Sequence, residues 1–187
     1  MSATATIPGY TAGRWDIDPA NSAVTFTVRH MLVNTMHGRF NVFAGEVVTR
    51  ENPLESTVAA AIETSSIDSN DRERDEHLRA PEYLDVSAHP LMSYRSTALR
   101  EDADGYVLDG ELTLKGMSRQ VPLWLEPGGI LAPDPIGKTR MGIAATGSID
   151  RADFGLSSEL LDMPLIGGLL VSRRVEIRID IEATLAR

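Results

Sequence analysis

The side chains best suited to chemistry in this sequence are its four histidines and a charged segment around Arg74. His30 ends a run in which Val24, Phe26 and Val28 alternate with polar residues, so it is expected at the end of an apolar strand face. There it could contact the polar head of a bound ligand at the mouth of a barrel. It could equally be a structural histidine that bonds to neighbouring backbone groups.

Arg74 and His77 are three residues apart in a segment with helical spacing, which would place them on one helix face. Together they could bind an anionic head group. Alternatively, Arg74 could form a fixed ion pair that ties the helix to the rest of the fold. Asn70 is expected to cap this helix, with Glu73 in the capping-box position.

No catalytic or metal-binding set is evident. The chain has no cysteine, and His30 and His37 are seven residues apart without a carboxylate cluster nearby, whereas zinc needs clustered ligands. The sequence shows no nucleophile elbow, phosphate loop or dinucleotide fingerprint, and no pair of convergent carboxylates for acid–base work. We therefore predict a protein that is not an enzyme, with no metal and no catalytic residue. An enzyme acting on a lipophilic substrate is the alternative.

Length and charge narrow the classes of partner. The 187 residues suit one domain, with residues 1–13 as a flexible arm and residues 14–187 as the folded unit. The net charge of −9 repels phosphate backbones, so nucleic acid is not expected as a partner. No apolar stretch is long enough for stable membrane insertion. Residues 1–14 contain neither a basic leader nor an apolar run, which predicts a cytoplasmic protein. A homodimer stays open.

The clearest strand pattern in the sequence is that of the last expected strand, Arg174–Leu185. From Val175 onward, apolar and charged residues alternate without interruption for nine residues, which is the pattern of a strand with one buried face. At the strand rise these residues span about 30 Å. The interior beneath this face must be filled either by packed side chains or by a ligand.

Further strands follow the same alternation, and one short helical segment interrupts them before Pro81. A bulge at Phe43 is expected to bend the strand Gly38–Thr49. Residues 126–138, rich in proline and glycine, are expected to form a loop. The other expected strands are 14–18, 22–31, 57–67, 91–100, 106–115, 120–126 and 139–150.

Eight or nine strands at hairpin-like spacing predict an all-β fold with one or two short helices, as an antiparallel barrel or a sandwich. An eight-stranded barrel can hold one small ligand. Gly110, Ala145 and Gly147, small residues on inward faces, favour a hollow interior. The segment Ser157–Val171, apolar but broken by Pro164 and two glycines, is a candidate gate or a capped end of the core.

Six segments, taken together and in order, resemble the YceI-like family of lipid-binding proteins, over a stretch from about Trp15 to Leu185. The segments are 22–31 (SAVTFTVRHM), 38–40 (GRF), 74–78 (RDEHL), 90–94 (PLMSY), 110–116 (GELTLKG) and 151–156 (RADFGL). The resemblance implies an eight-stranded, lipocalin-like antiparallel barrel whose interior is a long apolar tunnel. Many members of the family are exported to the periplasm.

What the resemblance implies for function is a carrier, with a polyisoprenoid, an isoprenoid quinone or a similar amphiphile as its ligand and no other cofactor. His30 and Tyr94 are expected as polar contacts in the tunnel. The predicted ligand-binding residues are Phe26, Val28, His30, Phe40, Tyr94, Leu112, Leu114, Ile143, Ile177 and Ile179.

Overall fold

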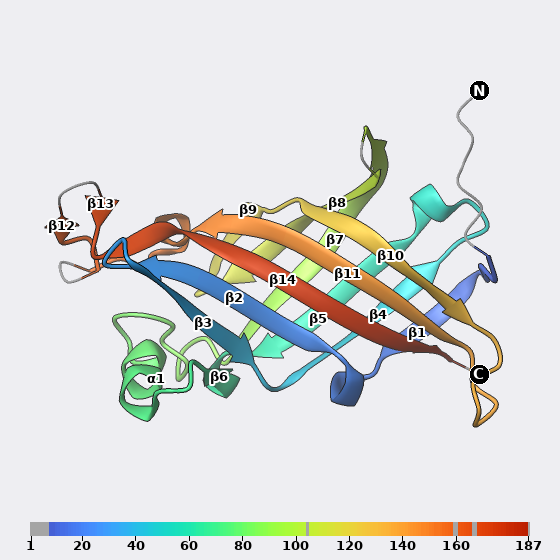
Figure 1. Ribbon diagram of the computed structural model, residues 1–187, viewed down its shortest axis with the longest axis horizontal. Helices are drawn as coiled ribbons and strands as arrows, with labels where there is room; N and C mark the ends of the chain where they lie inside the picture. Colours follow the sequence, from blue (N-terminus) through green and yellow to red (C-terminus); the bar gives the residue numbers. More distant parts are fainter. Residues whose placement is uncertain (1–7, 104, 159–160, 166–167, 187) are drawn as a thin grey trace.

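The chain folds as a closed antiparallel β-barrel with a short helix at one end, seen in the computed structural model in Figure 1. The structure describes residues 8–103, 105–158, 161–165 and 168–186. Among them, eight strands follow one another around the barrel, and β1 pairs with β14 to close it. These strands are, in spatial order, β1 (Gly13–Ile17), β4 (Phe43–Thr49), β5 (Thr57–Glu63), β7 (Leu91–Asp102), β8 (Gly105–Leu114), β10 (Leu123–Leu131), β11 (Arg140–Asp150) and β14 (Val171–Leu185). The predicted eight-stranded barrel is confirmed.

Further strands and short helices extend this barrel. The strands are β2 (Ala23–His30), β3 (Asn34–Phe40), β6 (Ile67–Asp68), β9 (Met117–Gln120), β12 (Pro164–Leu165) and β13 (Gly168–Leu169). The helices are α1 (Arg72–Arg79) and the 3-10 turns η1 (Pro19–Asn21), η2 (Pro53–Glu55), η3 (Thr64–Ser66) and η4 (Arg151–Phe154).

Strand β14 joins the ring of barrel strands to β2, β3 and β6, which continue the sheet beyond it. It pairs with β11 along most of its length, from Thr184 opposite Arg140 to Arg174 opposite Asp150. On its other edge it pairs with β1 near the C-terminal end and with β2 toward the N-terminal end. The uninterrupted alternation of the last strand is thus that of the longest strand of the sheet, with one face turned to the interior.

The strand predicted over residues 38–49 is in fact two strands. Strand β3 begins earlier, at Asn34, and ends at Phe40, and β4 starts at Phe43. The break resets the alternation, so Phe40 and Phe43 both line the interior while Val42 is 46% exposed. The expectation of one bulged strand was therefore wrong. Residues 41 and 42 lie between the two strands, so Phe40 and Phe43 both point inward although they are an odd number of residues apart.

Two further expectations on local structure were wrong. Asp71 caps α1, since its side chain accepts a hydrogen bond from the Arg74 backbone N–H at 3.1 Å, whereas Asn70 precedes it with a φ of 60°. Strand β10 continues to Leu131, so residues 126–131 are not a loop. Pro127 is accommodated because the register with β11 shifts between Pro127 and Gly129.

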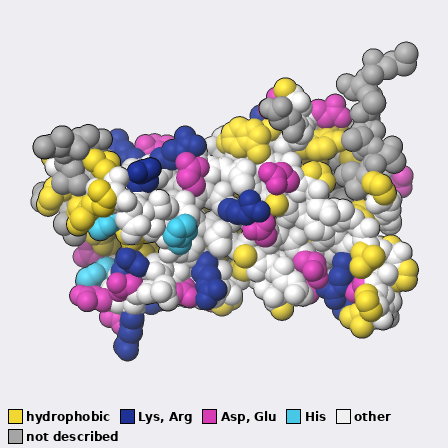
Figure 2. Space-filling view, in the orientation of Figure 1, with side chains coloured by type: hydrophobic (Ala, Val, Ile, Leu, Met, Phe, Trp, Pro, Cys, Tyr) yellow, Lys and Arg dark blue, Asp and Glu magenta, His cyan; other side chains and the backbone are white. Residues whose placement is uncertain are grey.

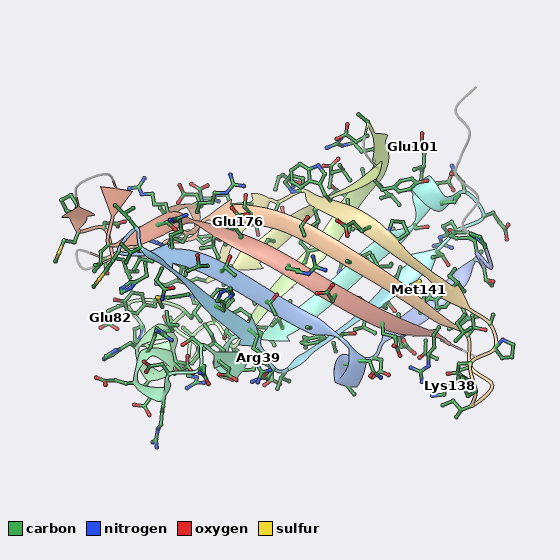
Figure 3. The ribbon with its side chains drawn as sticks, viewed as in Figure 1. Arg39, Glu82, Glu101, Lys138, Met141 and Glu176 are labelled. Atoms are coloured by element: carbon green, nitrogen blue, oxygen red, sulfur yellow. The ribbon has the colours of Figure 1, made fainter. Side chains whose placement is uncertain are left out.

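A cluster of buried side chains fills one end of the barrel. Trp15, fully buried, lies among Val47, Met141 and Ala183, and its indole N–H donates to the Thr49 hydroxyl at 2.8 Å. Met141 is labelled near this end in Figure 3. We call this group, Trp15, Val47, Met141 and Ala183, the closed end.

The described part of the predicted arm is attached to the closed end. The Thr49 hydroxyl lies 2.7 Å from the Thr11 carbonyl, and Tyr10 donates to the Arg50 carbonyl at 2.7 Å. Gly13 begins β1. Residues 1–7 of the arm lie outside the described residues, and residues 10–13 belong with the barrel.

An ion cluster lies beside the closed end. Arg140 pairs with Asp134 at 2.6 Å, with Asp18 at 3.2 Å and with Glu182. Asp134 also accepts the backbone N–H groups of Ile136 and Lys138. The hydrogen bond from Arg140, followed by those from the backbone, lowers the pKa of Asp134 below its usual 3.8.

Because the folded protein holds Asp134 ionised, its contribution to stability is full above the unfolded pKa and is lost as the pH falls through the lower folded pKa. We expect wild type to be more stable than Asp134→Asn at neutral pH. The difference in free energy of unfolding should shrink progressively below about pH 5. Urea unfolding at a series of pH values measures it, and a difference independent of pH would contradict the assignment.

Candidate functional site

The barrel encloses a cavity of about 600 Å³, within the range of small-molecule sites. Its lining along β14 runs from Val171 to Ile181, roughly 30 Å at the strand rise. The lining begins at Val47 of the closed end, with Ile143 packed beside it, and ends among side chains of α1. Its shape is therefore that of a long tunnel.

All ten residues predicted from the sequence line this tunnel. They come from six strands, β2, β3, β7, β8, β11 and β14, so the fold brings together residues far apart in the chain. Phe26 and Phe40 pack against each other with ring centroids 5.7 Å apart. The lining residues among the predictions are Phe26, Val28, His30, Phe40, Tyr94, Leu112, Leu114, Ile143, Ile177 and Ile179. That they contact a ligand stays a prediction.

The small inward residues have two different roles. Ala145 lines the tunnel and leaves it open. Gly110 instead makes room for Tyr94, whose ring would lie 2.4 Å from an added Cβ, and Gly147 makes room for Leu123, at 2.8 Å. The glycines therefore accommodate neighbouring side chains, and of the three small residues Ala145 alone supports the original argument for a hollow interior.

Tyr94 presents its ring rather than its hydroxyl to the tunnel. The hydroxyl lies 3.1 Å from the Leu108 carbonyl and 3.0 Å from the Val121 carbonyl, and can donate to either. Burial raises the pKa of this phenol, so it stays protonated and bound to the backbone. The expectation of a polar contact from Tyr94 is thus revised to an aromatic one.

Polar side chains are concentrated at the α1 end of the tunnel, which we call the mouth. His30 lies there at the end of β2, and Ser69, Arg74 and His77 line the same end. The rest of the lining is predominantly apolar. The tunnel can therefore hold a long apolar chain with a polar group at the mouth.

Among the residues that the structure describes, Arg74 does not form the ion pair expected as one alternative. Within the described residues its guanidinium donates to Ser69, to the hydroxyl at 2.8 Å and to the carbonyl at 2.7 Å. Asp75, buried behind it, accepts the Ser69 backbone N–H at 2.9 Å. These bonds fix the segment before α1, so Arg74 positions the wall of the mouth.

Arg151 is the residue at the mouth that sequence reasoning missed. It is 4% exposed, and it donates to the carbonyls of Leu156 at 2.7 Å and Val171 at 2.9 Å. It also pairs with Asp162 at 2.9 Å. An arginine in a turn carries no sequence signal for burial, since arginine is mostly exposed.

Through these bonds Arg151 joins both ends of the predicted gate, Ser157–Val171. Leu161, Leu170 and Val171 of this segment line the tunnel. Residues 159–160 and 166–167 lie outside the described residues. Leu161, Leu170 and Val171 form part of the wall of the mouth, and movement of the segment as a gate stays a prediction.

Two properties of the described residues bear on other functions. No group of three or more histidine or acidic side chains there is arranged to hold a metal ion. Within the same ranges, no helix has the length and apolar character needed to cross a bilayer.

Comparisons with known proteins agree with this geometry. A UPF0312 protein of Pectobacterium atrosepticum is 36% identical over 148 residues, covering 79% of this chain and 77% of the relative. The crystal structure of Burkholderia cenocepacia BcnA aligns with a TM-score of 0.74 at 22% identity, over 90% of this chain and 99% of that one.

A polyisoprenoid-binding domain from Saccharophagus degradans has a TM-score of 0.70 at 14% identity, over 94% of this chain and 100% of that one. Identities this low establish the fold alone. The family model described as the YceI-like domain matches residues 15–183 of this chain, nearly its whole length. The chain therefore belongs to the YceI-like domain family.

Proposed function

We propose that this protein binds one long-chain amphiphile, such as a polyisoprenoid or an isoprenoid quinone, inside the barrel. The observation that carries the proposal is the tunnel of about 600 Å³ with its apolar walls and polar mouth. The Saccharophagus domain, described as polyisoprenoid-binding, supports it through a shared fold.

Affinity would come mainly from the apolar chain, at about 25 cal/mol for each Å² removed from water. The polar head would stay near His30 and His77, where polar side chains are available. Buried polar groups without partners are costly, so the polarity gradient of the tunnel sets the orientation of the ligand, with its tail toward the closed end.

The protein purified from its native host is expected to carry close to one equivalent of a long-chain apolar compound. Organic extraction followed by mass spectrometry measures both the identity and the amount. A matched extraction of the Ala145→Phe variant, whose new ring would occupy the tunnel, should yield much less. Absence of any such compound from wild type, with no uptake of added prenol, would contradict the proposal.

A further inference from the structure

The turn between β2 and β3 has an unusual sequence for its backbone. Met31 and Leu32 have φ values of 51° and 62°, and the Val33 N–H donates to the His30 carbonyl at 3.3 Å. Positive φ at both central residues is the geometry for which Asn-Gly is preferred, since a β-carbon is disfavoured there. Two large apolar side chains at these positions are not explained by the stability of the turn.

Met31 and Val33 contribute to an exposed apolar surface, and Leu32 between them is partly buried. Val33 is 85% exposed, Met31 48% and Met163, in the neighbouring segment, 44%. A backbone hydrogen bond from the Met31 N–H to the Leu170 carbonyl, at 2.7 Å, joins the two segments. Within the second segment, the Leu170 N–H donates to the Met163 carbonyl at 2.8 Å. We call Met31, Leu32, Val33 and Met163 the apolar rim.

The apolar rim borders the mouth of the tunnel. His30, directly before the turn, and Leu170, bonded to it, both line the cavity. Figure 1 places the β2–β3 turn, β12, β13 and α1 at one end of the barrel, and Figure 2 shows hydrophobic side chains gathered there. The other end of the tunnel is filled by the closed end, so an apolar ligand must pass the rim.

We infer that the apolar rim inserts into the surface of a lipid bilayer, so that an amphiphile moves between bilayer and tunnel without crossing water. The inference rests on the proposed function. Continuity of the rim with the mouth selects a bilayer as the occupant, because the ligand class proposed for the tunnel resides there. The net charge of −9 disfavours attraction to anionic lipids, so the contact depends on apolar insertion and requires no anionic lipid.

The test is flotation of the full chain with phosphatidylcholine vesicles. Wild type should float with the vesicles, and Met31→Ser combined with Val33→Ser should lower its partition coefficient at least tenfold, equivalent to about 1.4 kcal/mol. Leu131→Ser combined with Ile136→Ser is the matched control. These residues are 56% and 69% exposed beside the closed end, and their replacement should change the partition coefficient less than twofold.

A second variant separates membrane contact from folding. Met31→Asn combined with Leu32→Gly supplies the residues that the turn geometry prefers. Its urea midpoint should equal or exceed that of wild type, while its vesicle binding should fall by a similar factor. A merely structural role for the turn would move both quantities in the same direction.

Three flotation results would overturn the inference. They are wild type that does not float, a control variant that loses as much binding as the rim variant, and binding restricted to anionic vesicles and abolished by salt. A dimer in sedimentation that the rim variant dissociates would instead assign the surface to a second copy of the chain. Flotation needs no bound ligand, so its failure is distinguishable from failure of ligand extraction.

Discussion

Replacing Ala145 by Phe is expected to lower the affinity for a fluorescent long-chain probe at least tenfold, while the empty protein keeps its urea midpoint. Ala145 lines the tunnel from β11, opposite Ile179 of β14. In a filled core the added ring would cost about 1–3 kcal/mol of strain. In the open tunnel it occupies the space proposed for the ligand, so binding falls and folding does not.

The matched control is Ala144→Phe, one residue earlier on the same strand. Neighbouring residues of a strand point to opposite faces, and Ala144 is absent from the described lining of the tunnel. This variant should bind the probe as wild type does. Titration of probe fluorescence measures both variants. Undiminished binding by Ala145→Phe, or a loss of stability typical of overpacking, would argue that the interior is not the binding site.

Replacing Arg151 by Ala is expected to destabilise the protein by at least about 1–3 kcal/mol, the usual cost of leaving a buried hydrogen-bond acceptor without its donor. The carbonyls of Leu156 and Val171 would lose a shared donor, and Asp162 would lose the nearer of its two arginine partners, keeping Arg173 at 4.0 Å. Arg151→Lys should recover little, because one ammonium cannot reproduce the planar fork of donors.

Urea unfolding monitored by circular dichroism gives the free energy, with an unchanged m value showing that the compactness of the unfolded state is the same. Arg174→Ala is the control, since its ion pair with Glu176 is exposed and such pairs contribute only about 0–1 kcal/mol. A loss below about 1 kcal/mol for Arg151→Ala would show that the bonds around it add little to stability.

Strand alternation predicted the strands and the side chains that face the interior, because both depend on the same repeat of two. Ile177 and Ile179 follow directly from the pattern of β14, and His30 from that of β2. Side chains on one strand face must share a surface, whichever strands neighbour them. The resemblance to the family added the closure of the sheet, which alternation alone leaves open between barrel and sandwich.

Features set by tertiary contacts were not predictable in this way. The cap of α1 shifted from Asn70 to Asp71 because both residue types cap helices and only the backbone conformation distinguishes them. The role of Gly110 depends on Tyr94, which comes from a neighbouring strand. Burial of Arg151 depends on carbonyls that the chain brings to it from up to 21 residues away.

The closed end has a kinetic consequence under the proposed function. With Trp15 and its neighbours filling one end of the barrel, a tail cannot leave there while another enters at the mouth. Exchange of one lipid for another must then pass through an empty carrier, in two successive half-reactions. A saturating concentration of a competing lipid would leave the off-rate of the resident lipid unchanged. A chain longer than the tunnel would be left with one end in the solvent.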